Sequence, residues 1–270
     1  MNKGVSCATR SLVPSLLAFA LLTCTIPALG QPAATAPQPA AGAFAYEAVT
    51  IKPADPNGGG WKYTPDGFST SGMPVENLIR AAFGLFTNDQ MVGLPGWAKS
   101  EPLAIQAKMD ADTLAALDKL PPMQRWKQTL LMMQALLADR FALKAHHETR
   151  DLPIYVLTVA KGGLKMKKTA PVATGGDANY GNGNISARSL PMDVLAMNLS
   201  STMGRVIVNK TGLEGGYDFT LEYAPEGADA SDTRPSIFAA LEEQLGLKLE
   251  PARGPVDVIV IDRIERPTAN

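Results

Sequence analysis

The two histidines of the sequence, His146 and His147, are the side chains best suited to acid–base or metal chemistry near neutral pH. They are adjacent in a segment whose composition is typical of a strand. Neighbouring residues of a strand point to opposite faces of a sheet, so the pair cannot clamp one metal ion from a regular strand. Glu148 follows them, which leaves open a single histidine ligand assisted by distant carboxylates. We interpret both histidines as polar residues at a strand end, and we predict no metal and no cofactor.

Patterns that assemble a nucleophile with a base are missing from the sequence. It contains no Gly-x-Ser-x-Gly, Ser-x-x-Lys or His-Glu-x-x-His motif. Paired acids could serve a glycosidase, which needs two carboxylates on either side of a sugar. The pairs Asp110 with Asp112 and Glu242 with Glu243 are better explained as charges on helix surfaces. We therefore predict no catalytic residue, and a hydrolase is the least favoured of the alternatives.

Two features are candidates for binding. Lys210, Thr211 and Gly212 follow an expected strand and could contact a ligand, although a strand end with Gly212 in a turn conformation explains them as well. Trp97 lies in a loop rich in glycine and proline and is the other candidate. Trp97 is too far in sequence from Trp61, Tyr155 and Tyr217 for these four residues to predict a carbohydrate-binding platform.

The charge of the chain is nearly balanced, with 25 Lys and Arg against 26 Asp and Glu. This argues against a nucleic-acid partner and against a polybasic patch for a membrane surface, because both need an excess of positive charge. The two cysteines, Cys7 and Cys24, both lie within the first 30 residues. The remaining chain therefore has no disulfide, thiol nucleophile or cysteine metal site, and must be stabilised by its apolar core.

Residues 1–30 have the three parts of a secretory signal. Lys3 and Arg10 give a positive start, and residues 12–24 form an apolar run. This run has only about 13 residues, against the roughly 20 that a membrane-spanning helix needs. We predict export to the periplasm or the medium, with no transmembrane segment left in the mature chain.

The expected cleavage site lies between Gly30 and Gln31, after the small residues Ala28 and Gly30. A lipid anchor at Cys24 is disfavoured, because a lipoprotein signal needs small residues directly before the cysteine. We therefore expect the mature protein to begin at Gln31 without a lipid.

Residues 31–43 are rich in proline and alanine and carry no charge, which predicts a spacer without a buried face. A polar stretch of Lys, Gly, Asn and Pro later in the chain is the best candidate for a boundary. The predicted organisation is a signal peptide (1–30), a spacer (31–43), a first α+β unit (44–164), a linker (165–183) and a second α+β unit (184–270).

The secondary-structure pattern occurs twice. A hairpin is expected over residues 61–70, with Pro-Asp-Gly at 65–67 as its tip, and a strand over residues 103–108. Helices opening with proline and then an acid are expected from Pro74 and from Pro191, and the first has an apolar stripe at helical spacing. A longer helix is expected after Pro121-Pro122, with Trp126 and Met133 on one side. A helix end followed directly by a strand occurs at residues 137–144 and again at 241–248. We predict an α+β fold of two duplicated helix-on-sheet units, of the type β-α-β-β-α-β-β, with mostly antiparallel or mixed sheets.

Near the end of each unit we expect two consecutive strands separated by a turn. In the first unit they are residues 141–149 and 152–160. In the second they are residues 247–250 and 256–264. Open edge strands in such units suit the addition of a strand from a partner protein.

Parts of the second half are similar to a known module. Residues 191–196, 204–208 and 245–249 resemble the short N-terminal domain of secretins and TonB-dependent transducers. That module has a helix, a strand with the pattern Gly-x-x-Ile/Val, a second helix and a final strand pair. The resemblance implies a small α+β unit in the second half.

The chain as a whole resembles a family of uncharacterised exported proteins of soil-associated bacteria, a domain of unknown function. The similar stretches cover most of residues 44–267, and include Pro-Gly-Trp at 95–97, Leu-Leu-Ala-Asp-Arg-Phe at 136–141 and Asn-Lys-Thr-Gly-Leu at 209–213. The resemblance assigns no activity. Related domains look like extracytoplasmic appendages of membrane metallopeptidases of the β-lactam-sensor type, which implies sensing or partner binding.

Together these observations predict a non-enzymatic interaction or sensing module of the cell envelope, with an envelope protein as its partner. The alternative is a protein that binds a small ligand or a glycan in a cleft between the two units.

Overall fold

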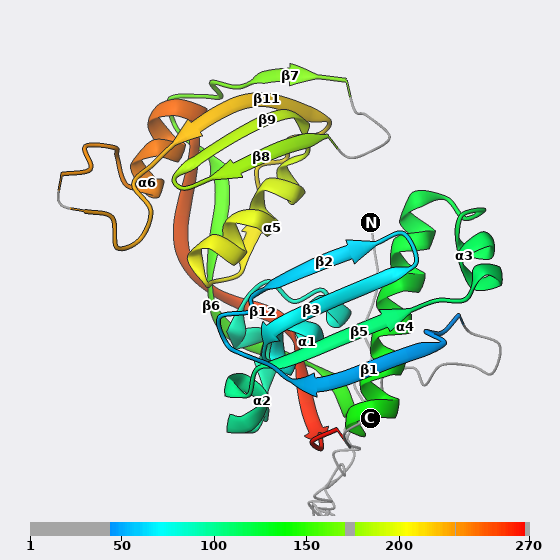
Figure 1. Ribbon diagram of the computed structural model, residues 1–270. Helices are drawn as coiled ribbons and strands as arrows, with labels where there is room; N and C mark the ends of the chain where they lie inside the picture. Colours follow the sequence, from blue (N-terminus) through cyan, green and yellow to red (C-terminus); the bar gives the residue numbers. More distant parts are fainter. Residues whose placement is uncertain (1–43, 171–175, 230, 268–270) are drawn as a thin grey trace, which may run out of the picture. The chain divides into compact units, whose positions relative to one another are not determined.

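The computed structural model describes residues 44–170, 176–229 and 231–267, and these residues form three four-stranded sheets (Figure 1). Runs of strands and helices follow one another along the chain, and the sheets are antiparallel or mixed, which confirms the predicted α+β class. The predicted signal peptide, its cleavage site between Gly30 and Gln31 and the spacer 31–43 lie outside the described residues. Within the described ranges, none of the helices combines the length and the apolar character needed to cross a bilayer.

The first sheet is antiparallel and has the strand order β1-β5-β3-β2. Its strands are β1 (Ala48–Pro53), β2 (Gly60–Thr64), β3 (Gly67–Met73) and β5 (Leu103–Lys108). The predicted hairpin is confirmed, because β2 and β3 pair on either side of Pro65 and Asp66. The helices of this half are α1 (Val75–Phe83), α2 (Gly96–Ser100), α3 (Ala111–Leu117) and α4 (Pro122–Phe141).

A second sheet, in the other half of the chain, has the order β7-β11-β9-β8. Its strands are β7 (Lys167–Thr169), β8 (Asp177–Gly181), β9 (Asn184–Leu190) and β11 (Gly216–Glu222). The helices are α5 (Met192–Met203) and α6 (Ile237–Ala240), which continues into a π-helical turn over Leu241–Leu245. Both β7 and β8 lie in the segment 165–183 that we expected to be a linker. Their polar side chains suit edge strands, which pair through the backbone and bury little.

The third sheet is a long ribbon made by β6 (Lys144–Val159) and β12 (Leu247–Arg263), which run antiparallel side by side (Figure 1). The expectation of two strands in each of these segments was wrong. Pro153 and Pro255 do not end the strands, because they lie opposite Arg253 and Asp151 within continuous pairing. An ion pair of 2.8 Å between Arg253 and Asp151 joins the strands at this point. The prediction treated each proline as a strand boundary, because the partner strand lies about a hundred residues away and leaves no local signal in the sequence.

Short strands from the two halves complete the ribbon in a reciprocal way. From the first half, β4 (Met91–Val92) pairs in parallel with β12. From the second half, β10 (Ile207–Asn209) pairs in parallel with β6. Each half therefore adds a short strand to the long strand that ends the other half.

The apolar cores follow the same exchange. Leu157 of β6 is fully buried in the core of the second half. Ile259 and Ile261 of β12 are buried in the core of the first half. The ribbon thus connects the two cores, and the described residues belong to one compact unit.

The order of elements in the two halves is the same at the level of topology. The sheets β1-β5-β3-β2 and β7-β11-β9-β8 have equivalent strand orders. The helices α1 and α5 both begin after a proline, Pro74 and Pro191, and the ribbon strands follow the last helical segment of each half. The predicted order β-α-β-β-α-β-β has one strand before the first helix of each half, whereas the structure has three, β1–β3 and β7–β9. An origin of the two halves by duplication stays a prediction.

Candidate binding groove

A groove of about 320 Å³ opens where the β2–β3 hairpin meets α3 and α4. Ligand sites in proteins have volumes in this range and are lined mainly by apolar and aromatic side chains. The groove is lined by Tyr46, Tyr63, Thr64, Pro65, Gly67, Phe68, Met109, Leu117, Pro122, Arg125, Trp126, Thr129 and Met133.

The floor of the groove is part of the first core. Phe68 lies opposite Tyr63 across the hairpin and is only 1% exposed. Trp61 stacks on the Phe68 ring with 5.1 Å between centroids, and Tyr46 meets the same ring edge-on at 5.5 Å. These contacts fix the aromatic floor from three separate strands or strand ends. On the opposite wall, Met133 of α4 is completely buried.

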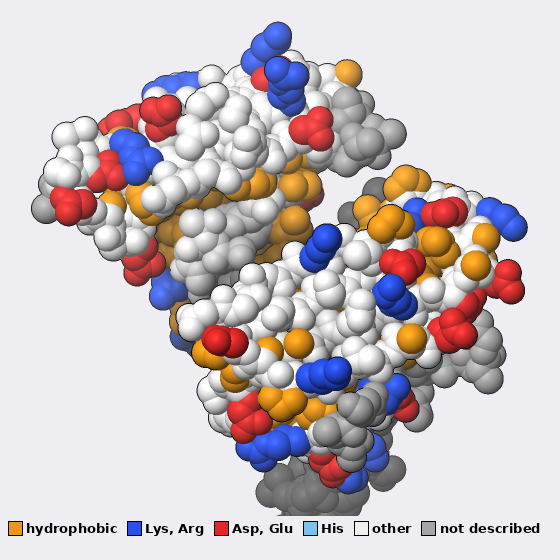
Figure 2. Space-filling view, in the orientation of Figure 1, with side chains coloured by type: hydrophobic (Ala, Val, Ile, Leu, Met, Phe, Trp, Pro, Cys, Tyr) orange, Lys and Arg blue, Asp and Glu red, His pale blue; other side chains and the backbone are white. Residues whose placement is uncertain are grey.

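The rim of the groove exposes large apolar side chains. Trp126 lies two turns before Met133 on α4. Its side chain is 49% exposed, whereas the side chain of Met133 is buried in the core. Tyr63 on the edge strand β2 is 57% exposed, and Met123 at the start of α4 is 65% exposed. In Figure 2 hydrophobic side chains gather at the surface over the region of α3 and α4. Exposed apolar groups that cluster around a cavity are typical of interaction sites.

The polar groups of the groove are neutral or paired. Burial raises the pKa of the Tyr46 hydroxyl, and the neighbouring Tyr63 adds to this effect. Burial also raises the pKa of Tyr63. Arg125 forms an ion pair of 2.5 Å with Asp118, so its charge is balanced at the rim. The groove can therefore offer aromatic faces and hydroxyl groups, with no buried unpaired charge among these residues.

The histidines do not belong to this groove. His146 contacts Asp262 and Glu148, and His147 contacts Asp257. In the register of the ribbon His147 lies opposite Ile259 of the first core, whereas His146 lies opposite Val260, which packs on a different apolar cluster. The two histidines therefore use opposite faces of the ribbon, as expected. Within the described ranges, no group of three acidic, histidine or cysteine side chains could hold a metal ion.

The acidic pairs noted in the sequence lie at helix positions. Asp110 caps α3, where its carboxylate accepts hydrogen bonds from the backbone N–H of Thr113 at 2.7 Å and from its hydroxyl at 2.9 Å. These hydrogen bonds lower the pKa of Asp110. Glu242 and Glu243 are exposed on the π-helical turn. This arrangement explains the acids as helix caps and surface charges.

The four binding candidates of the sequence lie in two places. Lys210, Thr211 and Gly212 form a turn after β10, in which Asn209 Oδ1 accepts hydrogen bonds from the Thr211 N–H at 3.0 Å and hydroxyl at 2.7 Å. The φ angle of Gly212 is 66°, which confirms the predicted turn conformation. Trp97 lies on α2, and the Arg266 guanidinium covers its ring at 5.1 Å. None of the four lines the groove, and their role in binding stays a prediction.

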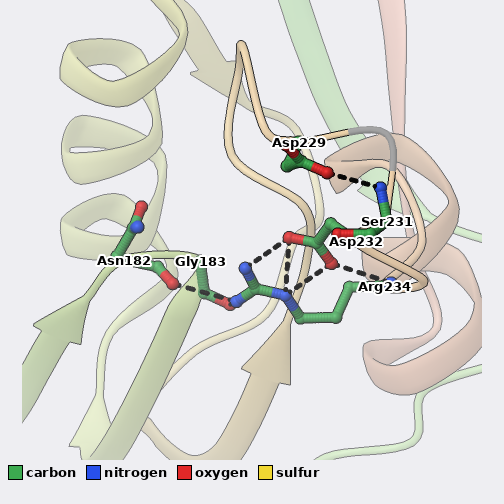
Figure 3. A network of polar contacts seen from close by, with 6 residues as sticks. All are labelled: Asn182, Gly183, Asp229, Ser231, Asp232 and Arg234. Atoms are coloured by element: carbon green, nitrogen blue, oxygen red, sulfur yellow. Dashed lines mark hydrogen bonds and ion pairs between the residues drawn. The ribbon is translucent and has the colours of Figure 1, made fainter.

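A polar network fixes the loop that follows β11 (Figure 3). Arg234 donates hydrogen bonds to both carboxylate oxygens of Asp232 and to the carbonyl oxygens of Asn182 and Gly183, at the tip of the β8–β9 hairpin. The hydrogen bonds from Arg234 lower the pKa of Asp232 to about 2. The network ties the loop to the hairpin, which is a structural role.

Tyr46, Tyr63 and Trp126 were not predicted as site residues. The turn residues predicted the hairpin tip beside Tyr63, and the helical spacing predicted that Trp126 lies on the same helix face as Met133. The missing information was that the core ends before Trp126, which leaves this ring at the surface beside the hairpin. A tryptophan at the polar start of an amphipathic helix was the signal available.

A family model described as "Protein of unknown function (DUF3738)" matches residues 76–264. No curated protein and no solved structure matches the chain.

Proposed function

We propose that this chain, which belongs to the DUF3738 family of proteins of unknown function, is a non-enzymatic binding module of the cell envelope that holds an extended segment of a partner protein. The groove beside the edge strand β2 carries this proposal. Its position at the cell envelope rests on the signal-like residues 1–30.

Two adjacent features, the groove and the free edge of β2, support binding of an extended segment. Tyr63 and Thr64 line the groove and are also residues of β2, which is the last strand of its sheet. An edge strand has backbone N–H and C=O groups free for pairing with an added strand, and neighbouring pockets can then take alternate side chains of that strand. A partner segment paired with β2 would therefore place a side chain between Tyr63 and Trp126.

The exposed charge on β2 suits a specific partner better than self-association. Lys62 lies in the middle of this strand and is exposed. A lysine on an edge strand discourages pairing between identical edges, because two copies would bring like charges together. A partner strand without a positive charge at that position avoids this repulsion.

Photo-crosslinking in intact cells tests the proposal. A photoreactive amino acid replaces Tyr63, and the matched control replaces Tyr180, which is 43% exposed on β8, the edge strand at the equivalent place in the second sheet. We expect a reproducible crosslinked partner from Tyr63 and a much weaker product from Tyr180. No product from Tyr63, or equal products from both positions, would contradict the proposal.

A small ligand or a glycan is the second candidate occupant. The exposed rings of Tyr63 and Trp126, next to the hydroxyl groups of Thr64 and Thr129, favour it in the same groove. A ligand at a hundred times its dissociation constant adds about 2.7 kcal/mol to stability, so a thermal-shift panel of sugars and peptides would detect it. A shift with a sugar that disappears in Trp126→Ala would favour this candidate over a protein partner.

A further inference from the structure

His146 has an unusual pair of contacts on the β6–β12 ribbon. Its Nδ1 lies 3.0 Å from Asp262 Oδ2, and its Nε2 lies 3.2 Å from Glu148 Oε1. A neutral imidazole carries one N–H and can donate to one of these carboxylates, with its second nitrogen lone pair facing the other. Only the doubly protonated ring donates to both. The geometry therefore fits the protonated form of His146.

The contact with Asp262 depends on an irregularity in β12. The register steps from Ile261 opposite Ala145 to Arg263 opposite Lys144, so Asp262 is an extra residue in the pairing. Such a bulge changes the direction of a side chain. His146 therefore contacts the residue at which regular pairing of β12 ends.

The two carboxylates in contact with His146 favour its protonated form, whereas the nearby cations Arg150 and Lys144 on β6 oppose it. From β12 the facing group is Asp262, and from β6 it is Glu148, which accepts hydrogen bonds from Arg150 at 2.8 and 2.9 Å. In the register of the ribbon His146 lies opposite Val260, and Val260 lies opposite Val92 of β4. Neither valine carries a charge. The hydrogen bond to Asp262 and then that to Glu148 raise the pKa of His146.

The chain after this bulge forms a strap over Trp97. We define the strap as residues 264–267. The Glu265 N–H donates to the Phe141 carbonyl at 2.7 Å, and Arg266 pairs with Glu101 at 2.5 Å. The Arg266 guanidinium lies 5.1 Å from the centre of the Trp97 ring. The strap therefore covers one face of Trp97, and its first residue, Ile264, packs on the first core.

We propose that His146, Glu148 and Asp262 form a proton-controlled clasp, which holds the strap over Trp97 when His146 carries two protons and releases it when one is lost. After loss of one proton, the ring either turns a nitrogen lone pair towards Asp262 or keeps the Nδ1–H without the positive charge. In both cases the contact that anchors the bulge weakens, because a charge-assisted hydrogen bond is stronger than one from a neutral donor. The strap then opens more often and uncovers the ring. Acidic surroundings close the clasp, and mildly alkaline ones loosen it.

His147 provides the matched control. It contacts a single carboxylate, with 2.8 Å between its Nδ1 and Asp257 Oδ2. A neutral ring protonated at Nδ1 satisfies this contact. The clasp therefore requires the pH response to depend on His146 and to be independent of His147, although the two residues are adjacent.

Amide hydrogen exchange of the purified protein tests the proposal, with protection factors of the 262–267 amides compared at about pH 6 and about pH 8. The pairs involved are exposed and contribute little, so we expect a roughly two- to fivefold loss of protection at the higher pH. His146→Gln should abolish this dependence, and His147→Gln should keep it. Protection of the amides of β9 and β11, the central strands of the second sheet, reports on global stability and should change little.

Asp262→Asn is a second variant that removes the partner and leaves the histidine in place, and it should also abolish the pH dependence. Equal protection of the strap at both pH values in the unmodified protein would overturn the proposal. A pH dependence that persists in His146→Gln or in Asp262→Asn would overturn it as well.

Discussion

Replacing Leu157 by alanine tests whether the β6–β12 ribbon makes the two cores unfold together. Leu157 belongs to the first half of the chain but is fully buried in the core of the second half. The change removes about three carbon atoms at about 0.8 kcal/mol each and leaves a cavity behind. We expect the free energy of unfolding to fall by about 2.5–5 kcal/mol.

The tryptophans make this coupling visible. All three lie in the first half: Trp61 and Trp97 pack on the first core, and Trp126 lines the groove. With a denaturant slope of about 2 kcal/mol/M, the urea midpoint should fall by about 1.2–2.5 M. Because the cores share a ribbon, tryptophan fluorescence should report the same shift as circular dichroism.

The control is Leu78→Ala, which makes the same change within the first core, where Leu78 is 1% exposed. It should also shift both signals together. The reasoning is refuted if Leu157→Ala leaves the tryptophan transition in place while circular dichroism shows a separate, earlier step. Two independently folding units would behave in that way.

Three further predictions concern single sites. Ser200→Ala should cost about 1–3 kcal/mol in urea unfolding, because the buried hydroxyl accepts a hydrogen bond from the Ile207 N–H at 2.8 Å. Gly246→Ala should cost about 1–3 kcal/mol in backbone strain, because the φ angle of Gly246 is 69°. A Cβ at this position would also collide with the Gly163 carbonyl group, and thermal unfolding should show the loss of stability. The lowered pKa of Asp232 stabilises the folded state above its ordinary value of 3.8, and this contribution is lost as the pH falls towards about 2. Asp232→Asn should therefore flatten the acid limb of the stability curve, whereas an unchanged limb would contradict the role of the pair with Arg234.

Local patterns predicted the elements that bury one regular face. The apolar stripe beginning at Val75 predicted α1, and the alternation of Leu103 to Lys108 predicted β5 with the same bounds. The turn residues Pro65 and Asp66 predicted the hairpin, because such residues favour a reversal of the chain. These signals are contained in short windows of sequence.

The features that were missed depend on partners far away in the chain. Pro153 and Pro255 look like strand ends until the ribbon places them within continuous pairing. The edge strand β8 has few apolar residues, and it is held in the sheet by its backbone pairing with β9. The exchange of β4 and β10 between the halves cannot be seen locally, because each is a strand of two or three residues.

The groove was missed for the same reason. Tyr63 and Trp126 are 63 positions apart in the numbering of the chain and meet only because α4 packs beside the hairpin. Trp97 and Lys210 were predicted from local composition and lie outside the groove: the Trp97 ring lies under Arg266, and the Lys210 N–H donates to the Leu157 carbonyl. Local composition could suggest aromatic and turn residues but not which of them share a cavity.

The most direct test of the groove as a binding site is the yield of the Tyr63 photo-crosslink in cells that carry Trp126→Ala. An aromatic side chain at the centre of an interface is worth about 2 kcal/mol or more, which corresponds to a roughly thirtyfold loss of affinity. We predict that the crosslinked partner is almost lost in Trp126→Ala. It should be kept in Phe238→Ala, which removes a ring that is 40% exposed in the other half of the chain. An unchanged yield in Trp126→Ala, with the protein present at its normal level, would contradict the account.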